Sequence, residues 1–195
     1  MNRQTLNRMV LLALFCALIV LLGLTPIGMI PLGFVYISLL AIPVVTGTML
    51  MGLKSGLLLG LCFGLVSFGT ALARPSALAA PVLALSPLGT ALMCVVPRLL
   101  IPIVTHLCFR ALRRKGHKAA YAVSAALGSL TNTVFYLGTM LLLYLLLGID
   151  AVPVLALIGG TGLIAGGLEA AAAAVISTPV LTALQKLNKG RNAMQ

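Results

Sequence analysis

The residue of this sequence with the most distinctive chemistry is Arg98, which lies in a long apolar run between Pro97 and Pro102. An unpaired arginine at the centre of a bilayer costs at least about 2.5–3.5 kcal/mol, so such a side chain faces the interior of a helix bundle and finds partners there. Glu169 is the acidic residue at a similar depth. Two hypotheses follow. Arg98 forms a stabilising ion pair with Glu169, or its guanidinium binds a carboxylate or another anionic group of a ligand.

A second polar group, centred on Thr131 and Asn132, interrupts a later apolar segment. Counting about 1.5 Å per residue places Arg98, Asn132 and Glu169 near the middle third of a hydrocarbon core about 30 Å thick. The three side chains are therefore predicted to meet. Thr131 and Asn132 are candidates for ligand contact, with interhelical hydrogen bonding as the alternative.

The residue types argue against an enzyme. Intramembrane metalloenzymes need clustered carboxylates or histidines, and the chain has two acidic residues, Glu169 and Asp150. The four cysteines lie singly, without the spacing of a metal site, and the sequence contains no G-x-x-x-x-G-K-[ST] phosphate loop. We expect no catalytic residues, no metal and no cofactor, and any energy from ATP would have to come from another chain.

The composition is that of an integral membrane protein. Of 195 residues, 61% are apolar and 8% are charged, and the mean hydropathy is +1.19. At roughly 20 residues per spanning helix, the chain has room for about six helices and short connections. The net charge of +11 does not indicate nucleic-acid binding, because the basic residues lie mainly between apolar segments and so report topology.

We therefore expect an all-α membrane protein with a single domain over residues 1–195, folded as a compact bundle of six transmembrane helices. The expected spans cover residues 6–24, 37–53, 56–73, 87–109, 119–147 and 153–184. Residues 25–36 contain too many prolines and glycines for a helix and are predicted to fold back over the membrane face as a loop. Residues 74–86 form a second connection on the same side.

The positions of the basic residues predict the orientation. With six spans, most of them share one side with both chain ends, and Arg74 and Asp150 lie on the other. Cytoplasmic connections carry the excess of Lys and Arg, so both termini are expected in the cytoplasm. The residues on that side are Arg3, Arg8, Lys54, Arg110, Arg113, Arg114, Lys115, Lys118, Lys186, Lys189 and Arg191.

Three glycines, Gly56, Gly60 and Gly64, recur at every fourth position of the third expected span. This spacing exposes backbone on one helix face and allows another helix to approach closely. We expect packing within the chain, with a homodimer face as the alternative.

The small residues Ala13 and Ala17 in the first span form an Ala-x-x-x-Ala motif. Together with short spans and a Pro/Gly-rich first loop, it resembles the substrate-binding S components of energy-coupling factor (ECF) vitamin transporters. The resemblance is strongest to the branch that includes pantothenate-specific members. It is carried by the segments IPLGFVYISLLAIPVVTGTMLMGLKSGLLLGLCFGLVSF, VPRLLIP, LGSLTNT and GLEAAAAAVISTPVL.

The resemblance implies a high-affinity binder in the bacterial plasma membrane. The chain would capture a vitamin, with pantothenate as the best guess, in a pocket closed by the loops at 25–36 and 74–86. It would then dock through Ala13 and Ala17 on a coupling subunit with two ATPases. The implied substrate-binding residues are Arg98, Asn132, Thr131, Glu169, Phe34 and Tyr36.

Three alternatives stay open at this point. The chain could bind a different vitamin or a related small molecule. It could be a self-contained secondary transporter or channel with an Arg98–Glu169 gate. It could also be an assembly protein whose glycine and alanine faces hold partners.

Overall fold

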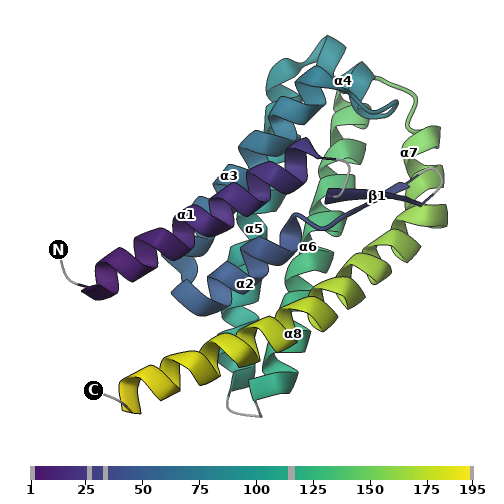
Figure 1. Ribbon diagram of the computed structural model, residues 1–195. Coiled ribbons are helices and arrows are strands. Elements are labelled where there is room, and N and C mark those ends of the chain that lie inside the picture. Colours follow the sequence, from purple (N-terminus) through teal and green to yellow (C-terminus); the bar gives the residue numbers. More distant parts are fainter. Residues whose placement is uncertain (1–2, 26–27, 33–34, 114–116, 194–195) are drawn as a thin grey trace.

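The computed structural model describes residues 3–25, 28–32, 35–113 and 117–193, which form a mainly helical bundle (Figure 1). The helices are α1 (Arg3–Leu24), α2 (Ala41–Met51), α3 (Leu53–Ala73), α4 (Ala79–Leu85), α5 (Pro87–Leu112), α6 (His117–Leu146), α7 (Val152–Leu157) and α8 (Leu163–Ala193). A π-helical turn, η3 (Ile158–Gly162), precedes α8, and the strands β1 (Met29–Leu32) and β2 (Val35–Ser38) lie between α1 and α2.

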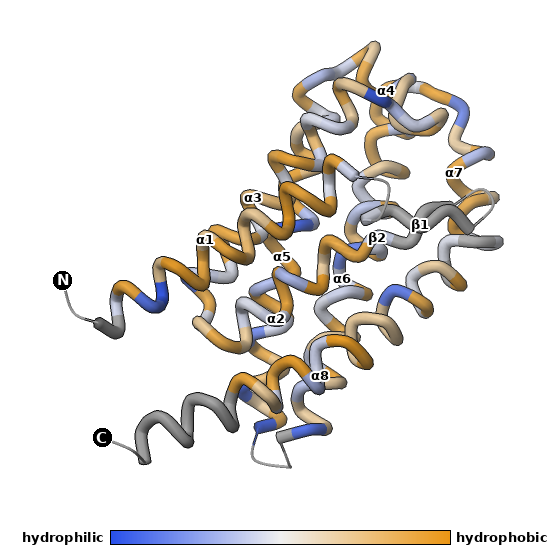
Figure 2. Tube along the Cα trace, in the orientation of Figure 1, coloured by the Kyte–Doolittle hydropathy of each residue, from blue (hydrophilic) through white to orange (hydrophobic). Residues whose placement is uncertain are grey.

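Five helices in the described residues are long and apolar enough to cross a membrane, namely α1, α3, α5, α6 and α8. The chain is therefore a multi-pass membrane protein. In Figure 2 these helices are predominantly apolar, and the hydrophilic residues gather near helix ends with a few exceptions in the interior.

The second expected span, residues 37–53, is the part of the six-helix prediction that the structure does not reproduce. Its first residues belong to β2, and its helix is α2, which has 11 residues and a length of about 16 Å at 1.5 Å per residue. Gly52 ends α2 with a φ of +85°, a conformation that favours glycine. By length, α2 falls short of a hydrocarbon core about 30 Å thick.

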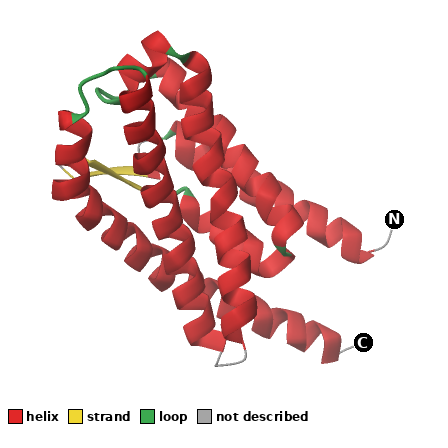
Figure 3. Ribbon diagram, turned by 180° about the vertical axis from the view of Figure 1, so that it is seen from behind, coloured by secondary structure: helices red, strands yellow, loops and turns green. Residues whose placement is uncertain are grey.

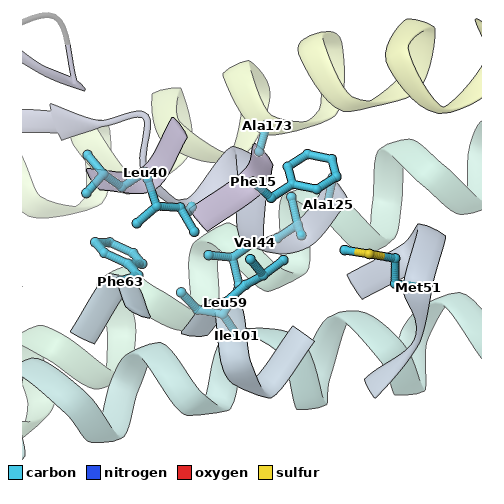
Figure 4. Close-up of a cluster of buried hydrophobic side chains, with 12 residues drawn as sticks. Phe15, Leu40, Val44, Met51, Leu59, Phe63, Ile101, Ala125 and Ala173 are labelled. Carbon is cyan, nitrogen blue, oxygen red and sulfur yellow. The ribbon is translucent and has the colours of Figure 1, made fainter. Parts of the chain in front are cut away.

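Although short, α2 is at the centre of the bundle. Its side chains contribute to a buried apolar cluster that also receives residues from α1, α3, α5, α6 and α8 (Figure 4). The labelled members are Phe15, Leu40, Val44, Met51, Leu59, Phe63, Ile101, Ala125 and Ala173. Close packing of such side chains fixes the positions of the helices.

The segment expected as a loop, residues 25–36, contains the start of an antiparallel β-hairpin. Strand β1 pairs with β2 from Met29 opposite Ser38 to Leu32 opposite Val35, and the backbone N–H of Leu39 donates to the carbonyl of Gly28 at 3.0 Å. Figure 3 shows the hairpin as the yellow strands lying among the helices. In the described part of this segment the chain forms no α-helix, as predicted, whereas the strand pairing was not predicted from the sequence.

The start of α1, the end of α8 and the adjoining ends of α5 and α6 lie at one end of the bundle, and α4 lies at the opposite end (Figure 1). Arg8 of α1 fixes part of this arrangement, because its guanidinium donates to the carbonyl of Met51 at the end of α2 and to the hydroxyl of Ser55. The exposed basic residues Arg110 and Lys118 flank the α5–α6 connection. The assignment of this end to the cytoplasm stays a prediction from the charge rule.

The glycines of α3 pack within the chain, as expected. A Cβ added at Gly60 would lie 2.6 Å from the carbonyl oxygen of Arg98, and one at Gly64 would lie 3.0 Å from the Cα of Val95. One at Gly56 would collide with the hydroxyl of Thr48. The missing side chains therefore allow α3 to approach α5 at the level of Arg98.

Helix α5 begins at Pro87, and the Ser86 hydroxyl caps it by accepting the N–H of Gly89 at 3.0 Å. The helix continues through Pro97 and Pro102 to Leu112, so both prolines that flank Arg98 are accommodated without ending it. The connection expected at residues 74–86 contains the short helix α4.

Candidate functional site

Arg98 is 7% exposed and points into the bundle between two aromatic rings. Its guanidinium carbon lies 5.2 Å from the ring centre of Phe63 on α3 and 4.5 Å from that of Tyr136 on α6. Both distances fall within the range of cation–π attraction. The rings thus offset part of the cost of burying the charge and hold the guanidinium plane in place.

Among the described residues, most of the hydrogen-bonding capacity of Arg98 is unused. A guanidinium has five N–H donors, and in Arg98 one nitrogen, Nη1, donates to the carbonyl of Met93 at 3.0 Å. The Nε atom is buried without an acceptor. An acceptor with two oxygens, such as a carboxylate, matches the fork of donors that remains.

Glu169 lies on α8, is 6% exposed and accepts a hydrogen bond at each carboxyl oxygen. The backbone N–H of Ser38, the last residue of β2, donates to Oε1 at 2.7 Å. The hydroxyl of Thr133 on α6 donates to Oε2 at 2.8 Å. Glu169 therefore connects the hairpin to α6 and α8.

Arg98 and Glu169, both among the described residues, do not form the ion pair that was one of the two hypotheses, and the Glu169 oxygens accept instead from Ser38 and Thr133. Both charges nevertheless approach the same stretch of α6. Arg98 contacts Tyr136 from α5, and Glu169 contacts Thr133, one turn earlier, from α8. The Nε atom of Arg98 stays without an acceptor in this arrangement.

Asn132 and Thr131 lie on the same stretch of α6 and are 6% and 8% exposed. The Thr131 hydroxyl donates to the carbonyl of Leu127 in its own helix at 2.7 Å. The side-chain carbonyl oxygen of Asn132 is buried without a hydrogen-bond donor. Asn132 thus has an unused acceptor at the level of the two charges, whereas Thr131 is satisfied by the backbone.

The two aromatic candidates come from the hairpin segment. Phe34 lies outside the described residues. Tyr36 is in β2 opposite Pro31, and its side chain also lies outside what the structure describes. The end of the hairpin at Ser38 does reach the site, through its bond to Glu169.

Sequence reasoning missed three contributors to the site, namely Phe63, Tyr136 and Ser38. Tyr136 follows Asn132 by one helical turn, so the i, i+4 spacing could have placed it on the same face. Neither Phe63 nor Ser38 carries such a signal, since each reaches the site through the packing of another element.

The predicted docking residues Ala13 and Ala17 are both exposed on α1. In the apolar window of α1, 11% of residues are buried, and their large neighbours Val10, Leu14 and Leu21 are exposed as well. In Figure 2 most of this helix is coloured as hydrophobic.

The described residues thus form a multi-pass membrane bundle with a buried, incompletely paired cation in its interior. The family model described as ECF transporter, substrate-specific component, matches residues 7–181. The chain therefore belongs to this family of substrate-binding subunits of ECF transporters. No curated protein matches the sequence.

Proposed function

We propose that this chain is a high-affinity binding subunit that captures an anionic vitamin, with pantothenate as the specific candidate, and delivers it inward together with an ECF coupling subunit and two ATPases. The observation that carries the proposal is Arg98, a buried guanidinium with aromatic rings beside it and one of its five donors in use. Such a group binds a carboxylate through two parallel hydrogen bonds.

The neighbouring groups suit the uncharged part of such a ligand. The free oxygen of Asn132 accepts a hydrogen bond from a hydroxyl or amide N–H. Phe63 and Tyr136 supply apolar surface close to Arg98. A ligand with a carboxylate at one end and amide and hydroxyl groups along its length would use all of these features.

Pantothenate has this chemistry. It combines a carboxylate with an amide and hydroxyl groups, and the chain resembles the pantothenate branch at segments that include VPRLLIP, around Arg98, and LGSLTNT, which ends in Asn132 and Thr133. These are the segments that meet at α6 in the structure. Both lines of support concern the same residues.

The hairpin would act as the movable cover of this pocket. It is held to the helices through the bond from Ser38 to Glu169, which lies beside the proposed ligand. The loop at 74–86, which contains α4, would complete the cover.

Coupling to ATP hydrolysis would use the exposed face of α1. Ala13 and Ala17 give this face a smooth strip, and small residues allow helices to approach closely in a membrane. The proposed partner is the transmembrane coupling subunit, whose two ATPases supply the energy.

Isothermal titration calorimetry on purified protein tests the binding assignment. Wild-type protein is expected to bind pantothenate, and Arg98→Met is expected to weaken binding at least about 100-fold, which corresponds to about 2.7 kcal/mol. Arg110→Met is the matched control, because Arg110 is an exposed arginine on the same helix. It should keep the wild-type affinity.

Wild-type affinity in Arg98→Met would contradict the pocket assignment. If the wild-type protein binds a different vitamin with a carboxylate and Arg98→Met does not, the assignment of the pocket holds and pantothenate is replaced as the proposed ligand. The secondary-transporter alternative with an Arg98–Glu169 gate gains no support from the geometry, since Glu169 is bonded to Ser38 and Thr133.

A further inference from the structure

A group of buried polar oxygens in the bundle has no hydrogen-bond partner in the described structure. It comprises the hydroxyls of Thr105, Ser124 and Ser129 and the side-chain carbonyl oxygen of Asn132. The four residues are 0%, 0%, 1% and 6% exposed, respectively. We refer to them as the inner polar group.

Threonine hydroxyls elsewhere in the helices behave differently. Each of several donates to the carbonyl four residues earlier in its own helix, which is the usual way to satisfy a hydroxyl in a transmembrane helix. They are Thr48, Thr131, Thr139, Thr178 and Thr182. The hydroxyls of the inner polar group lack this bond, so the backbone does not satisfy them.

The inner polar group continues the ligand site along the bundle. Thr105 follows Arg98 by seven residues on α5, which is about 10 Å along the helix axis. Its hydroxyl lies against Gly128 of α6, where an added Cβ would collide with it. Ser124 lies one turn before Gly128 and Ser129 directly follows it. The group thus extends from Asn132 toward the α5–α6 end of the bundle.

Buried polar atoms in a protein interior are nearly always paired, with ordered water as the partner when protein groups are lacking. A buried water forms two to four hydrogen bonds and can donate to one atom while accepting from another. The Asn132 oxygen needs a donor, and each hydroxyl can donate or accept. A few waters could therefore satisfy the whole group.

We propose that the inner polar group binds ordered water molecules and so forms a hydrated site between α5 and α6, beside α2, that continues the Arg98 site toward the end of the bundle holding Lys118. Val45 of α2 lies next to this site, because a Cβ added at Gly128 would be 2.9 Å from the Cγ1 atom of Val45. The proposal depends on these oxygens alone and is independent of which ligand the chain binds.

Thermal unfolding of a pair of matched variants tests the proposal. Thr105→Val and Thr48→Val make the same change at two threonines that are 0% and 1% exposed. In both, the γ-oxygen faces a glycine of a neighbouring helix, Gly128 or Gly56. The difference is that Thr48 donates to the carbonyl of Val44 at 2.6 Å, whereas Thr105 would depend on water.

If water is bound, Thr105→Val removes one of its partners, and its Tm should fall about 2–4 °C below that of the wild-type protein, as the Tm of Thr48→Val should on loss of its own bond. If the site is dry, Thr105→Val removes an unsatisfied polar group, which is neutral or stabilising. A Tm for Thr105→Val equal to or above that of the wild-type protein would overturn the proposal, and Thr48→Val is the reference for the loss of one buried threonine bond.

Ser124→Ala repeats the test by removing a hydroxyl without adding any heavy atom. A lower Tm in this variant therefore cannot result from a steric clash. It should also lower the Tm of the full-length protein, and an unchanged or raised Tm would count against bound water. An experimental structure at about 2 Å resolution gives a direct readout. Water density within hydrogen-bond distance of the Thr105 hydroxyl and the Asn132 oxygen is expected, and its absence would contradict the proposal.

Discussion

Helices α1 and α5 have similar lengths and hydropathies but occupy the bundle in opposite ways. In the apolar window of α1, 11% of residues are buried, against 39% in that of α5. Helix α5 carries Arg98 into the interior, whereas α1 exposes Ala13 and Ala17. One helix contributes a charge to the site, and the other leaves a smooth apolar face uncovered.

The proposed ligand site and the proposed docking face therefore lie on separate parts of the molecule. Helix α1 packs mainly on α3 and α2. Among the described side chains of α1, Arg8 forms hydrogen bonds to Met51 and Ser55 outside this helix. The site around Arg98 is built from α3, α5, α6, α8 and the hairpin. Substitutions in the two regions should therefore have separable effects.

The largest separable effect is expected from Ala17→Trp. A bulky side chain on the exposed face should prevent close helix packing with the coupling subunit, so ATP-driven uptake in vesicles containing the full complex should fall to background. The Kd for ligand in the isolated protein should stay unchanged. Val134→Trp adds the same ring at an exposed position of α6 and should leave uptake intact. Normal uptake by Ala17→Trp would remove α1 from the docking role.

Gly60→Ala tests the close contact that positions α5. The new methyl group would lie 2.6 Å from the Arg98 carbonyl oxygen, and overpacking of this kind costs about 1–3 kcal/mol. We expect a lower Tm and weaker ligand binding. Gly69→Ala on the same helix has no atom within 4 Å of the new Cβ, and should be neutral or slightly stabilising because alanine favours helix. Equal Tm values for the two variants would refute the close α3–α5 contact.

Glu169→Gln tests the attachment of the hairpin. Glutamine keeps one acceptor oxygen for the Ser38 N–H, and its NH2 group can donate to the Thr133 hydroxyl, so both contacts persist without the extra strength that an ionised acceptor gives them. We expect about tenfold weaker ligand binding, equivalent to about 1.4 kcal/mol, and faster hydrogen exchange at the Ser38 amide. Asp150→Asn, in an exposed turn, is the matched control. Unchanged exchange at Ser38 would show that Glu169 does not hold the hairpin.

Arg8→Met should give the smallest effect. It removes the contact with the Met51 carbonyl and the Ser55 hydroxyl, and we expect this partly buried contact as a whole to contribute about 1 kcal/mol. The Tm should fall by about 2–4 °C, with no change in the Kd for ligand, because the contact belongs to the α1 side of the comparison. A weakening of ligand binding comparable to that in Glu169→Gln would show that the two regions are not separable.

The level of the polar site could be predicted from the sequence because helical rise fixes depth. Counting residues brought Arg98, Asn132 and Glu169 to one layer, and the structure gathers their elements around the same stretch of α6. The glycine spacing of α3 also predicted close packing, because the sequence alone shows on which helix face the side chains are missing. The spans at 56–73 and 87–109 coincide with α3 and α5 within a few residues.

The remainder depends on tertiary contacts that composition does not encode. Residues 37–53 are apolar throughout, and hydropathy does not distinguish a membrane span from a strand end followed by a short buried helix. The ion pair was inferred because Arg98 and Glu169 are at one depth, but depth does not determine direction around a helix axis. Phe63 and Ser38 reach the charges only after α3 and the hairpin have packed.

Native mass spectrometry of gently purified protein tests the central claim most directly. We expect the wild-type chain to retain a carboxylate-bearing small molecule with the mass of pantothenate or a related vitamin. Arg110→Met should retain this molecule as well, whereas Arg98→Met should not. Retention of the same molecule by Arg98→Met at the wild-type level would contradict the assignment of Arg98 as the anchor of the ligand.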